Sequence, residues 1–404
     1  MIRFCNTMLA ATLLSLSLLV ITSNSAAQDY VVGNNDGYPT NTVSVFEVSG
    51  ASLINVTAVE TGGEGLGGGR FSSVTQSIAQ DGKNTCVFVG NGYSSNISAM
   101  KVIDAKPYLQ LVNTYSSPSG GSGQYFGIGI TVSNGYLYAN NTGNGSTISP
   151  DIDVWQITPG CTLAYASSYP DTYGLGDGII DGMAVTPNGK YLVVAYGDGS
   201  VGSYAIGGGS IALVSQELIA GRGVGQGAYA GSVAISSNGK WAIFGDFSPF
   251  NTTQFDVAGI GSNGVLAPTT TYGGTGSLGE GLQTNGISLS PNNQFIYSVD
   301  TGSGQETTVA FDSTTGVITY PNNCLLDLKG YNTEWSYASQ SAVVANSGSG
   351  GGIYISEGFL SGSQNSYIAL LGVNSKTGCV TEAPHSPFAD ANGNALQSIT
   401  SYSR

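Results

Sequence analysis

Short apolar stretches separated by polar turns recur along the chain. The clearest unit is residues 182–196 (GMAVTPNGKYLVVAY), in which two apolar runs flank a Pro-Asn-Gly-Lys turn. Two β-rich runs joined by an Asn-Gly turn predict a β-hairpin. The same unit returns at residues 232–247 (SVAISSNGKWAIFGDF) and 286–300 (GISLSPNNQFIYSVD), and looser copies lie at residues 77–91, 130–141 and 341–358. Six hairpins are therefore predicted.

The hairpin turns recur with a nearly constant period. They fall 50–58 residues apart, at Gly82, Gly135, Gly189, Gly239, Asn293 and Gly351. A regular period of this size indicates repeated supersecondary units. A second strand without a first begins the array at Tyr30–Asn34, and a first strand without a second ends it at Leu396–Tyr402. Pairing the two halves closes the ring, so the sequence predicts an all-β, seven-bladed β-propeller.

Each blade is predicted to hold four antiparallel strands, a to d, of which a and b form the hairpin. Strand c alternates polar and apolar residues, as half-buried strands do. It is predicted at residues 43–48, 97–102, 152–157, 201–206, 253–257, 308–311 and 367–371. Strand d is predicted to begin near residues 53, 109, 161, 211, 265, 317 and 379, before Gly-rich linkers to the next inner strand. No helix is expected.

The first 27 residues read as a secretory signal. They hold one charge (Arg3), an apolar run from Met8 to Ile21 and small residues at 25–27. The run is shorter than the ~20 residues that span a bilayer, so a cleaved signal is favoured over a membrane anchor. We therefore predict a signal peptide at 1–27, a propeller domain at 28–404 and a secreted, extracellular or periplasmic protein with no membrane span after cleavage.

Removal of the signal would leave four cysteines: Cys86, Cys161, Cys324 and Cys379. Two disulfides in any of three connectivities, or four buried thiols, fit this number in an exported protein.

Acidic residues outnumber basic ones by 25 to 11, which gives a formal net charge of −14. Such a surface repels nucleic acid and phosphate, so neither is an expected partner. Only 9% of residues are charged, yet 10% are aromatic, which favours a packed core over disorder.

Parts of the repeat resemble a known family. The hairpins that contain SPNNQFIY (from Ser290) and TPNGKYLVVAY (from Thr186), with NSKTGCVTEAPHSPF (from Asn374), look like secreted lactonase-type propellers. These are the 6-phosphogluconolactonase-like and YVTN-repeat proteins of bacteria. The resemblance implies the fold and, as an expectation, lactone chemistry that uses His, Arg and Glu near the axis. The single histidine is His385. Its position within the repeat predicts that it lies in the last linker from strand d to strand a.

Candidate site residues gather on one face of the predicted ring, because linkers from d to a and loops from b to c open on the same side. Catalytic candidates are Arg70, Arg222, Glu280 and Glu334; ligand-binding candidates are Asp181, Tyr125, Gln283 and Trp335; metal candidates are Asp177 and Asp181. The b-to-c loops add Asp36, Asp198, Asp246, Asp300, Glu306 and Glu357. Carboxylates here can bind a cation or act as a general base, whereas Asp before Gly can simply bond its own turn.

Three functions fit the sequence. The first is a binding propeller for a carbohydrate, peptide or surface polymer at the axial opening. The second is a lactonase-like hydrolase that opens a non-phosphorylated sugar lactone, and the third is a structural surface protein. No Gly-x-Ser-x-Gly elbow, His-Glu-x-x-His or phosphate loop is present. No cofactor is expected except a divalent cation such as Ca²⁺, and the oligomeric state is open.

Overall fold

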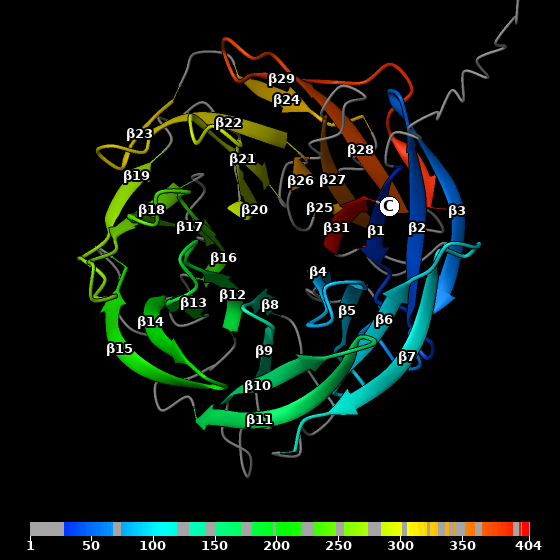
Figure 1. The fold of residues 1–404 in the computed structure, drawn as a ribbon. Helices are drawn as coiled ribbons and strands as arrows, with labels where there is room; N and C mark the ends of the chain where they lie inside the picture. The colour runs from blue at the N-terminus through cyan, green and yellow to red at the C-terminus, as the bar shows by residue number, and fades with distance from the viewer. Residues whose placement is uncertain are drawn as a thin grey trace, which may run out of the picture.

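Seven antiparallel sheets surround a central axis in the computed structural model (Figure 1). The structure describes residues 28–67, 74–118, 129–141, 151–170, 180–196, 199–219, 229–247, 254–273, 284–300, 305–320, 324–329, 336–338, 343–344, 352–359, 366–390, 396 and 398–403. These residues form strands and turns without a helix, and none of their segments is an apolar helix long enough to cross a membrane. The seven-bladed all-β prediction is confirmed; the proposed signal at 1–27 lies outside the described residues.

The blades follow one another along the chain, and each runs from strand a at the axis to strand d at the rim. Blade 1 holds β4 (Val74–Ile78), β5 (Thr85–Asn91), β6 (Asn96–Val102) and β7 (Leu109–Ser116). Blade 2 holds β8 (Ile130–Ser133), β9 (Tyr136–Asn141), β10 (Asp151–Thr158) and β11 (Thr162–Pro170). Blade 3 holds β12 (Ile180–Val185), β13 (Tyr191–Tyr196), β14 (Ser200–Gly207) and β15 (Ser210–Leu218).

Blade 4 holds β16 (Tyr229–Ile235), β17 (Trp241–Phe247), β18 (Gln254–Gly259) and β19 (Thr270–Gly273). Blade 5 holds β20 (Thr284–Leu289), β21 (Phe295–Asp300), β22 (Gln305–Asp312), β23 (Val317–Thr319) and β24 (Leu325–Asp327). Blade 6 holds β25 (Ser336–Ala338), β26 (Val343–Val344), β27 (Gly352–Phe359), β28 (Ser366–Val373), β29 (Val380–Glu382) and β30 (Phe388–Asp390). Blade 7 holds β31 (Ser398–Ser403), β1 (Asp29–Asn34), β2 (Thr42–Ser49) and β3 (Ser52–Glu60).

The ring closes as the half-hairpins predict. The C-terminal strand β31 is the inner strand of blade 7 and pairs antiparallel with β1, so that Tyr30 lies opposite Tyr402 and Asn34 opposite Ser398. This pairing removes the free edge that β1 would otherwise present to solvent.

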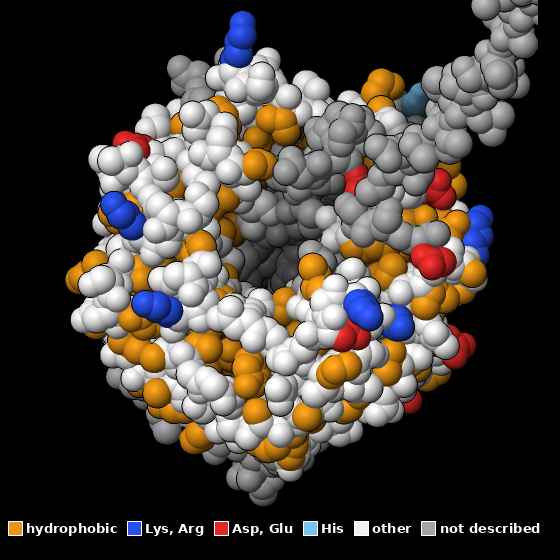
Figure 2. Space-filling view, in the orientation of Figure 1, with side chains coloured by type: hydrophobic (Ala, Val, Ile, Leu, Met, Phe, Trp, Pro, Cys, Tyr) orange, Lys and Arg blue, Asp and Glu red, His pale blue; other side chains and the backbone are white. Residues whose placement is uncertain are grey.

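Strand direction gives the ring two distinct faces. The a–b and c–d turns lie on one face, here called the hairpin face, and the b–c loops and d-to-a linkers lie on the other, here called the linker face. Figure 2 shows a hollow at the centre of the ring.

Strand d differs from the prediction in blades 4 to 6. In blade 4 it begins at Thr270 rather than near Val265, and Leu266 forms only an isolated bridge with Ile260. In blade 5 it is split into β23 and β24, and in blade 6 into β29 and β30. The breaks in blades 4 and 6 coincide with proline: Pro268 in blade 4, and Pro384 and Pro387 in blade 6. Proline has no N–H to donate to the ladder, which explains these interruptions.

The break in blade 6 also corrects the position of His385. This residue lies between β29 and β30, within the outer strand of blade 6, and not in the linker to the next inner strand. Its side chain is exposed at the rim.

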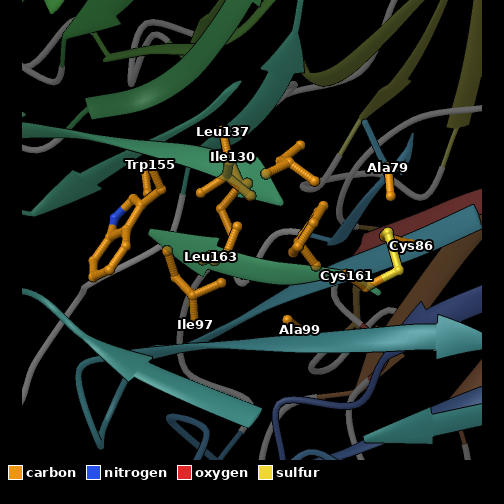
Figure 3. Close-up of a cluster of buried hydrophobic side chains, with 12 residues drawn as sticks. Ala79, Cys86, Ile97, Ala99, Ile130, Leu137, Trp155, Cys161 and Leu163 are labelled. Atoms are coloured by element: carbon orange, nitrogen blue, oxygen red, sulfur yellow. A yellow bond between two sulfur atoms is a disulfide. The ribbon is translucent and has the colours of Figure 1, made fainter. Parts of the chain in front are cut away.

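The core consists of apolar clusters between neighbouring blades. At the boundary of blades 1 and 2, Phe88 and Ile97 pack against Leu137, Trp155 and Leu163 (Figure 3). Each sheet therefore buries both faces against its neighbours, so a blade has no complete core of its own.

Both disulfides cross a blade boundary. Cys86 in β5 bonds Cys161 in the c–d turn of blade 2, with 5.5 Å between the Cα atoms (Figure 3). Cys324 of blade 5 bonds Cys379 in the c–d turn of blade 6, with 5.0 Å between the Cα atoms. One of the three connectivities left open by the sequence is thereby selected.

A contact between the start of strand b and the next blade's c–d turn recurs around the hairpin face. Aromatic rings of Tyr136, Tyr191, Trp241 and Phe295 lie under glycines of the following blade, respectively Gly209, Gly264, Gly316 and Gly378. All four glycines have positive φ. A methyl group at these glycines would come within 2.2–3.1 Å of the ring beneath. We call these contacts the ring–glycine contacts.

Other boundaries use the same position differently. The Cys86–Cys161 disulfide occupies it between blades 1 and 2. Between blades 7 and 1, the ring of Tyr30 lies 4.9 Å from that of Tyr108, a c–d turn residue with φ of 68°. Six of the seven blade boundaries thus have a contact at the same structural position on the hairpin face.

Replacement of Gly264 by alanine tests the ring–glycine contact. A Cβ there would lie 2.3 Å from the Tyr191 ring, at φ of 82°. We expect G264A to lower the free energy of unfolding by about 2–4 kcal/mol, from backbone strain of about 1 and overpacking of about 1–3. Gly50, in the c–d turn of blade 7, is the matched control: its φ is 60° and nothing lies within 4 Å. Both variants are compared with wild type by urea unfolding. Equal losses of unfolding free energy in G264A and G50A would contradict a stabilising role for the contact.

Candidate functional site

Most predicted site residues lie outside the part of the chain that the structure describes. These are Arg70, Tyr125, Asp177, Asp198, Arg222, Glu280, Gln283, Glu334 and Trp335. For Asp181, Asp246, Asp300 and Glu357 the structure describes the strand but not the side chain. Asp36 and Glu306 are described in full, as is Glu64. The assembly of Arg70, Asp181, Arg222, Glu280 and Glu334 at the axis therefore stays a prediction.

Asp181 occupies an irregular position that the sequence did not reveal. Ile180 pairs with Tyr196 and Gly182 with Ala195, so Asp181 is an extra residue in β12, a β-bulge. The same bulge recurs at Gly231 in β16 and Asn285 in β20. All three lie at the linker-face end of an innermost strand. Bulges re-aim side chains and are over-represented next to active sites, so this end of blades 3 to 5 is a structured rim for the axial opening.

Buried carboxyl groups concentrate in the half of the ring next to the linker face. Six of the seven buried acidic side chains in the described ranges lie there: Asp36, Asp151, Asp153, Asp256, Glu306 and Asp390. Asp29, at the start of β1, is the exception. Within those ranges six of seven lysines lie toward the hairpin face: Lys83, Lys101, Lys106, Lys190, Lys240 and Lys376. In the described part of the chain, lysine side chains are therefore scarce on the linker face.

Several of these carboxylates have hydrogen-bond donors. Asp390 accepts from the Ser44 hydroxyl at 2.6 Å and from the Asn55 amide at 3.1 Å, which links blade 6 to blade 7. The Thr271 hydroxyl donates to Asp256 at 2.5 Å. Such donors offset the cost of removing a carboxylate from water.

Asp153 lacks hydrogen-bond donors like those of Asp390 and Asp256. It is fully buried, and neither carboxyl oxygen makes a hydrogen bond of normal geometry. Burial raises the pKa of this carboxyl to about 7; the nearby Asp151 charge adds to the rise, and the Ser117 hydroxyl opposes part of it. Near neutral pH Asp153 therefore exchanges a proton inside the boundary of blades 1 and 2.

Glu306, at the boundary of blades 5 and 6, is a second buried carboxyl group whose oxygens lack hydrogen-bond donors. It is the second residue of β22, where β2, β6, β10 and β14 carry Val or Ile. Its cross-strand partners are Val299 and Leu326, it is fully buried, and its oxygens make no hydrogen bond of normal geometry. Burial raises its pKa well above the ordinary value, with a small opposing effect from the Ser298 main chain. Burial therefore favours the neutral form of the Glu306 carboxyl group.

Carboxyls of this kind are typical of functional sites, because a raised pKa suits general acid–base work. Three or more His, Cys, Asp or Glu side chains that could share a metal do not come together in the described part of the chain. The metal candidates Asp177 and Asp181 are not tested by that observation, because their side chains lie outside it.

Comparison with known proteins connects this fold to solved structures. No family model and no curated protein matches the chain. A proposed 6-phosphogluconolactonase from Bacteroides fragilis NCTC 9343 superposes with a TM-score of 0.67 at 15% identity, over 94% of this chain and 99% of that one. The periplasmic gluconolactonase of Pseudomonas aeruginosa gives 0.67 at 13%, over 93% and 99%.

A hypothetical selenium-binding protein from Sulfolobus tokodaii gives a TM-score of 0.64 at 10% identity, over 93% of each chain. Structural matches at such low sequence identity establish the fold alone. The resemblance to lactonase-type propellers drawn from the repeat is thereby confirmed at the level of the fold, and the selenium-binding example shows that one architecture carries different functions.

The pH dependence of stability tests the burial of Asp153. Between pH 4 and 7 the folded state keeps this proton while the unfolded chain, with a pKa of 3.8, has lost it, so stability falls as pH rises and stays low above pH 7. A rise from 3.8 to about 7 corresponds to roughly 4 kcal/mol. We expect D153N to flatten the decline between pH 5 and 8 in urea unfolding. Because wild type and variant share Glu306, their difference isolates Asp153; parallel curves would contradict the assignment.

Proposed function

We propose that this chain is an exported binding propeller whose linker face takes a neutral or cationic ligand at the axial opening. Carbohydrates, peptides and surface polymers are the ligand classes. The observation that carries the proposal is the distribution of lysines: in the described part of the chain six of seven lie toward the hairpin face, which leaves few cations on the linker face. Such an arrangement disfavours anions and attracts or tolerates cations and hydroxyl-rich molecules.

Export is supported by the two disulfides, since such bonds form and persist in oxidising compartments. A structural relative named as periplasmic points the same way. The apolar segment before residue 28 fits the same proposal as a cleaved signal.

Lactone hydrolysis is the second candidate. Structures named as a 6-phosphogluconolactonase and a gluconolactonase share the fold, and burial raises the pKa of the Glu306 carboxyl. In that case a carboxylate acts as general base on water and Arg70 or Arg222 stabilises the oxyanion. Hydrolysis of glucono-δ-lactone, measured with and without a chelator, separates this candidate from simple binding.

Substitution at the axial linkers tests the binding proposal. A glycan and peptide array identifies a bound molecule, and calorimetry then measures its affinity for the R222A/E280A double variant. We expect at least a tenfold loss, because both residues precede an innermost strand where linkers converge. The K190A variant on the hairpin face is the control and keeps the wild-type affinity. An R222A/E280A protein with unchanged affinity would remove the axial opening as the site.

Phosphate discrimination gives an independent test. The acidic chain offers few cations to hold a phosphate dianion, so we expect 6-phosphogluconolactone to bind weakly or not at all. Calorimetry with glucono-δ-lactone alongside provides the uncharged comparison. Micromolar affinity for the phosphorylated compound alone would show that the charge argument is wrong.

A further inference from the structure

Two exposed tyrosines stand together on the linker face at the boundary of blades 7 and 1. Tyr38 is 56% exposed and Tyr93 is 39% exposed, and their ring centroids lie 4.8 Å apart in an edge-to-face arrangement. The pKa of Tyr38 is raised, mainly by the neighbouring Tyr93 hydroxyl and least by the Glu64 carboxylate. We call Tyr38, Tyr93 and Glu64 the tyrosine platform.

Three segments that are far apart in sequence hold the platform. Tyr38 lies in the b–c loop of blade 7, Tyr93 in the b–c loop of blade 1, and Glu64 in the linker between these blades. The Glu64 carbonyl accepts hydrogen bonds from the amides of Tyr93 and Ser94 at 3.1 and 3.2 Å. The Glu64 amide donates to the Ser94 hydroxyl at 2.9 Å.

The other side of the linker is bonded to the loop of Tyr38. Asp36 is fully buried, and its carboxylate accepts from the Leu66 amide at 2.8 Å while its carbonyl accepts from Gly67 at 2.8 Å. The Gly65 amide donates to the Gly37 carbonyl at 2.7 Å. A methyl group at Gly65 would come within 2.2 Å of the Asp36 main chain, so glycine is required there.

A saturated amide network lies beneath the loops. Asn91 donates to Asn96 and Ser98, both at 2.7 Å, and accepts from Asn41 at 2.8 Å and Thr61 at 2.7 Å. These residues come from both blades, and Asn91 uses its full hydrogen-bonding capacity. The network fixes the base of the platform, so the tyrosines are held in place before any ligand arrives.

The chemistry of the platform favours a sugar ring. Tyrosine offers an apolar ring face with a polar hydroxyl, and an exposed pair on a fixed base supplies contact area at low entropic cost. Glu64 adds a carboxylate acceptor for ligand hydroxyl groups. The acidic linker face disfavours an anionic polymer. From this juxtaposition we propose that the tyrosine platform is a binding subsite for a neutral hexose ring of a glycan.

The loops that carry Tyr38 and Tyr93 join strands b and c, outside the innermost strands of their blades. The test of the platform is therefore separable from that of the function proposed above, with which it shares only the ligand class. Calorimetry of the full chain is performed with maltohexaose, cellohexaose, mannohexaose and chitohexaose, with polygalacturonate as the acidic glycan and choline as a cation. We expect one or more neutral hexasaccharides to bind, and Y38A/Y93A to weaken that binding at least tenfold. E64Q keeps a hydrogen-bonding group and loses less than Y38A/Y93A.

Tyr165 provides a matched control. It is 43% exposed and makes an edge-to-face contact with Trp155 at 5.3 Å, but it lies on the outer strand β11. Y165A therefore keeps wild-type glycan affinity, and circular dichroism with thermal unfolding checks that Y38A/Y93A is folded. A Y38A/Y93A protein that fails to fold is replaced by Y38S and Y93S singly, each expected to lose at least threefold.

Each other outcome overturns the proposal. If the platform variants bind the hexasaccharides as wild type does while R222A/E280A does not, the axial opening alone binds sugar. If choline binds, the E64Q substitution abolishes choline binding and no neutral glycan binds, the platform is a cation site. Tighter binding of polygalacturonate than of the neutral glycans, or no binding by any probe, also contradicts it.

Discussion

The ring depends on contact between neighbouring blades, because a four-stranded sheet with two apolar faces cannot bury them alone. The interior supplies this contact through inter-blade clusters, and the hairpin face through the ring–glycine contacts, the Tyr30–Tyr108 pair and the disulfides. A glycine is needed at four c–d turns, those of Gly209, Gly264, Gly316 and Gly378, because the aromatic ring leaves no room for a Cβ. The recurring aromatic residue after the a–b turn is thus explained by the adjacent blade and not by its own hairpin.

The linker face is held together by different means. At the boundary of blades 7 and 1 the side chain of Asn91 is saturated by neutral partners: it donates to Asn96 and Ser98 and accepts from Asn41 and Thr61. At the next boundary Asn141 takes the place of Asn91, while Asp151 and Asp153 take those of Asn96 and Ser98. The same structural position therefore holds a hydrogen-bonded amide network at one blade boundary and a protonatable carboxyl group at the next. The repeat leaves the linker face free to vary while the hairpin face holds the ring.

Local sequence signals predicted the parts of the fold that form locally. Asn-Gly turns and alternating strands identified the hairpins and the closing strand, since both depend on neighbouring residues. Strand d was misplaced only in blade 4, where Pro268 interrupts the ladder; in blades 5 and 6 it begins where predicted but is split. The split in blade 6, at Pro384 and Pro387, also explains why His385 was misplaced. The disulfide partners, the bulge at Asp181 and the burial of Asp153 depend on which blade lies alongside, which one sequence does not specify. The pairing of Tyr38 with Tyr93 belongs to the same class, although their shared position after strand b was a usable signal.

The closing strand β31 delays completion of blade 7 during folding. The strands of blades 1 to 6 precede β31 in the sequence, whereas β1, the first strand among the described residues, pairs with β31 more than 360 residues later. A contact of such long sequence separation forms late, since loop closure must precede it. Until then β1 presents an unpaired edge. During synthesis β1 therefore has a free edge that can pair with other strands, and pairing with β31 removes that edge.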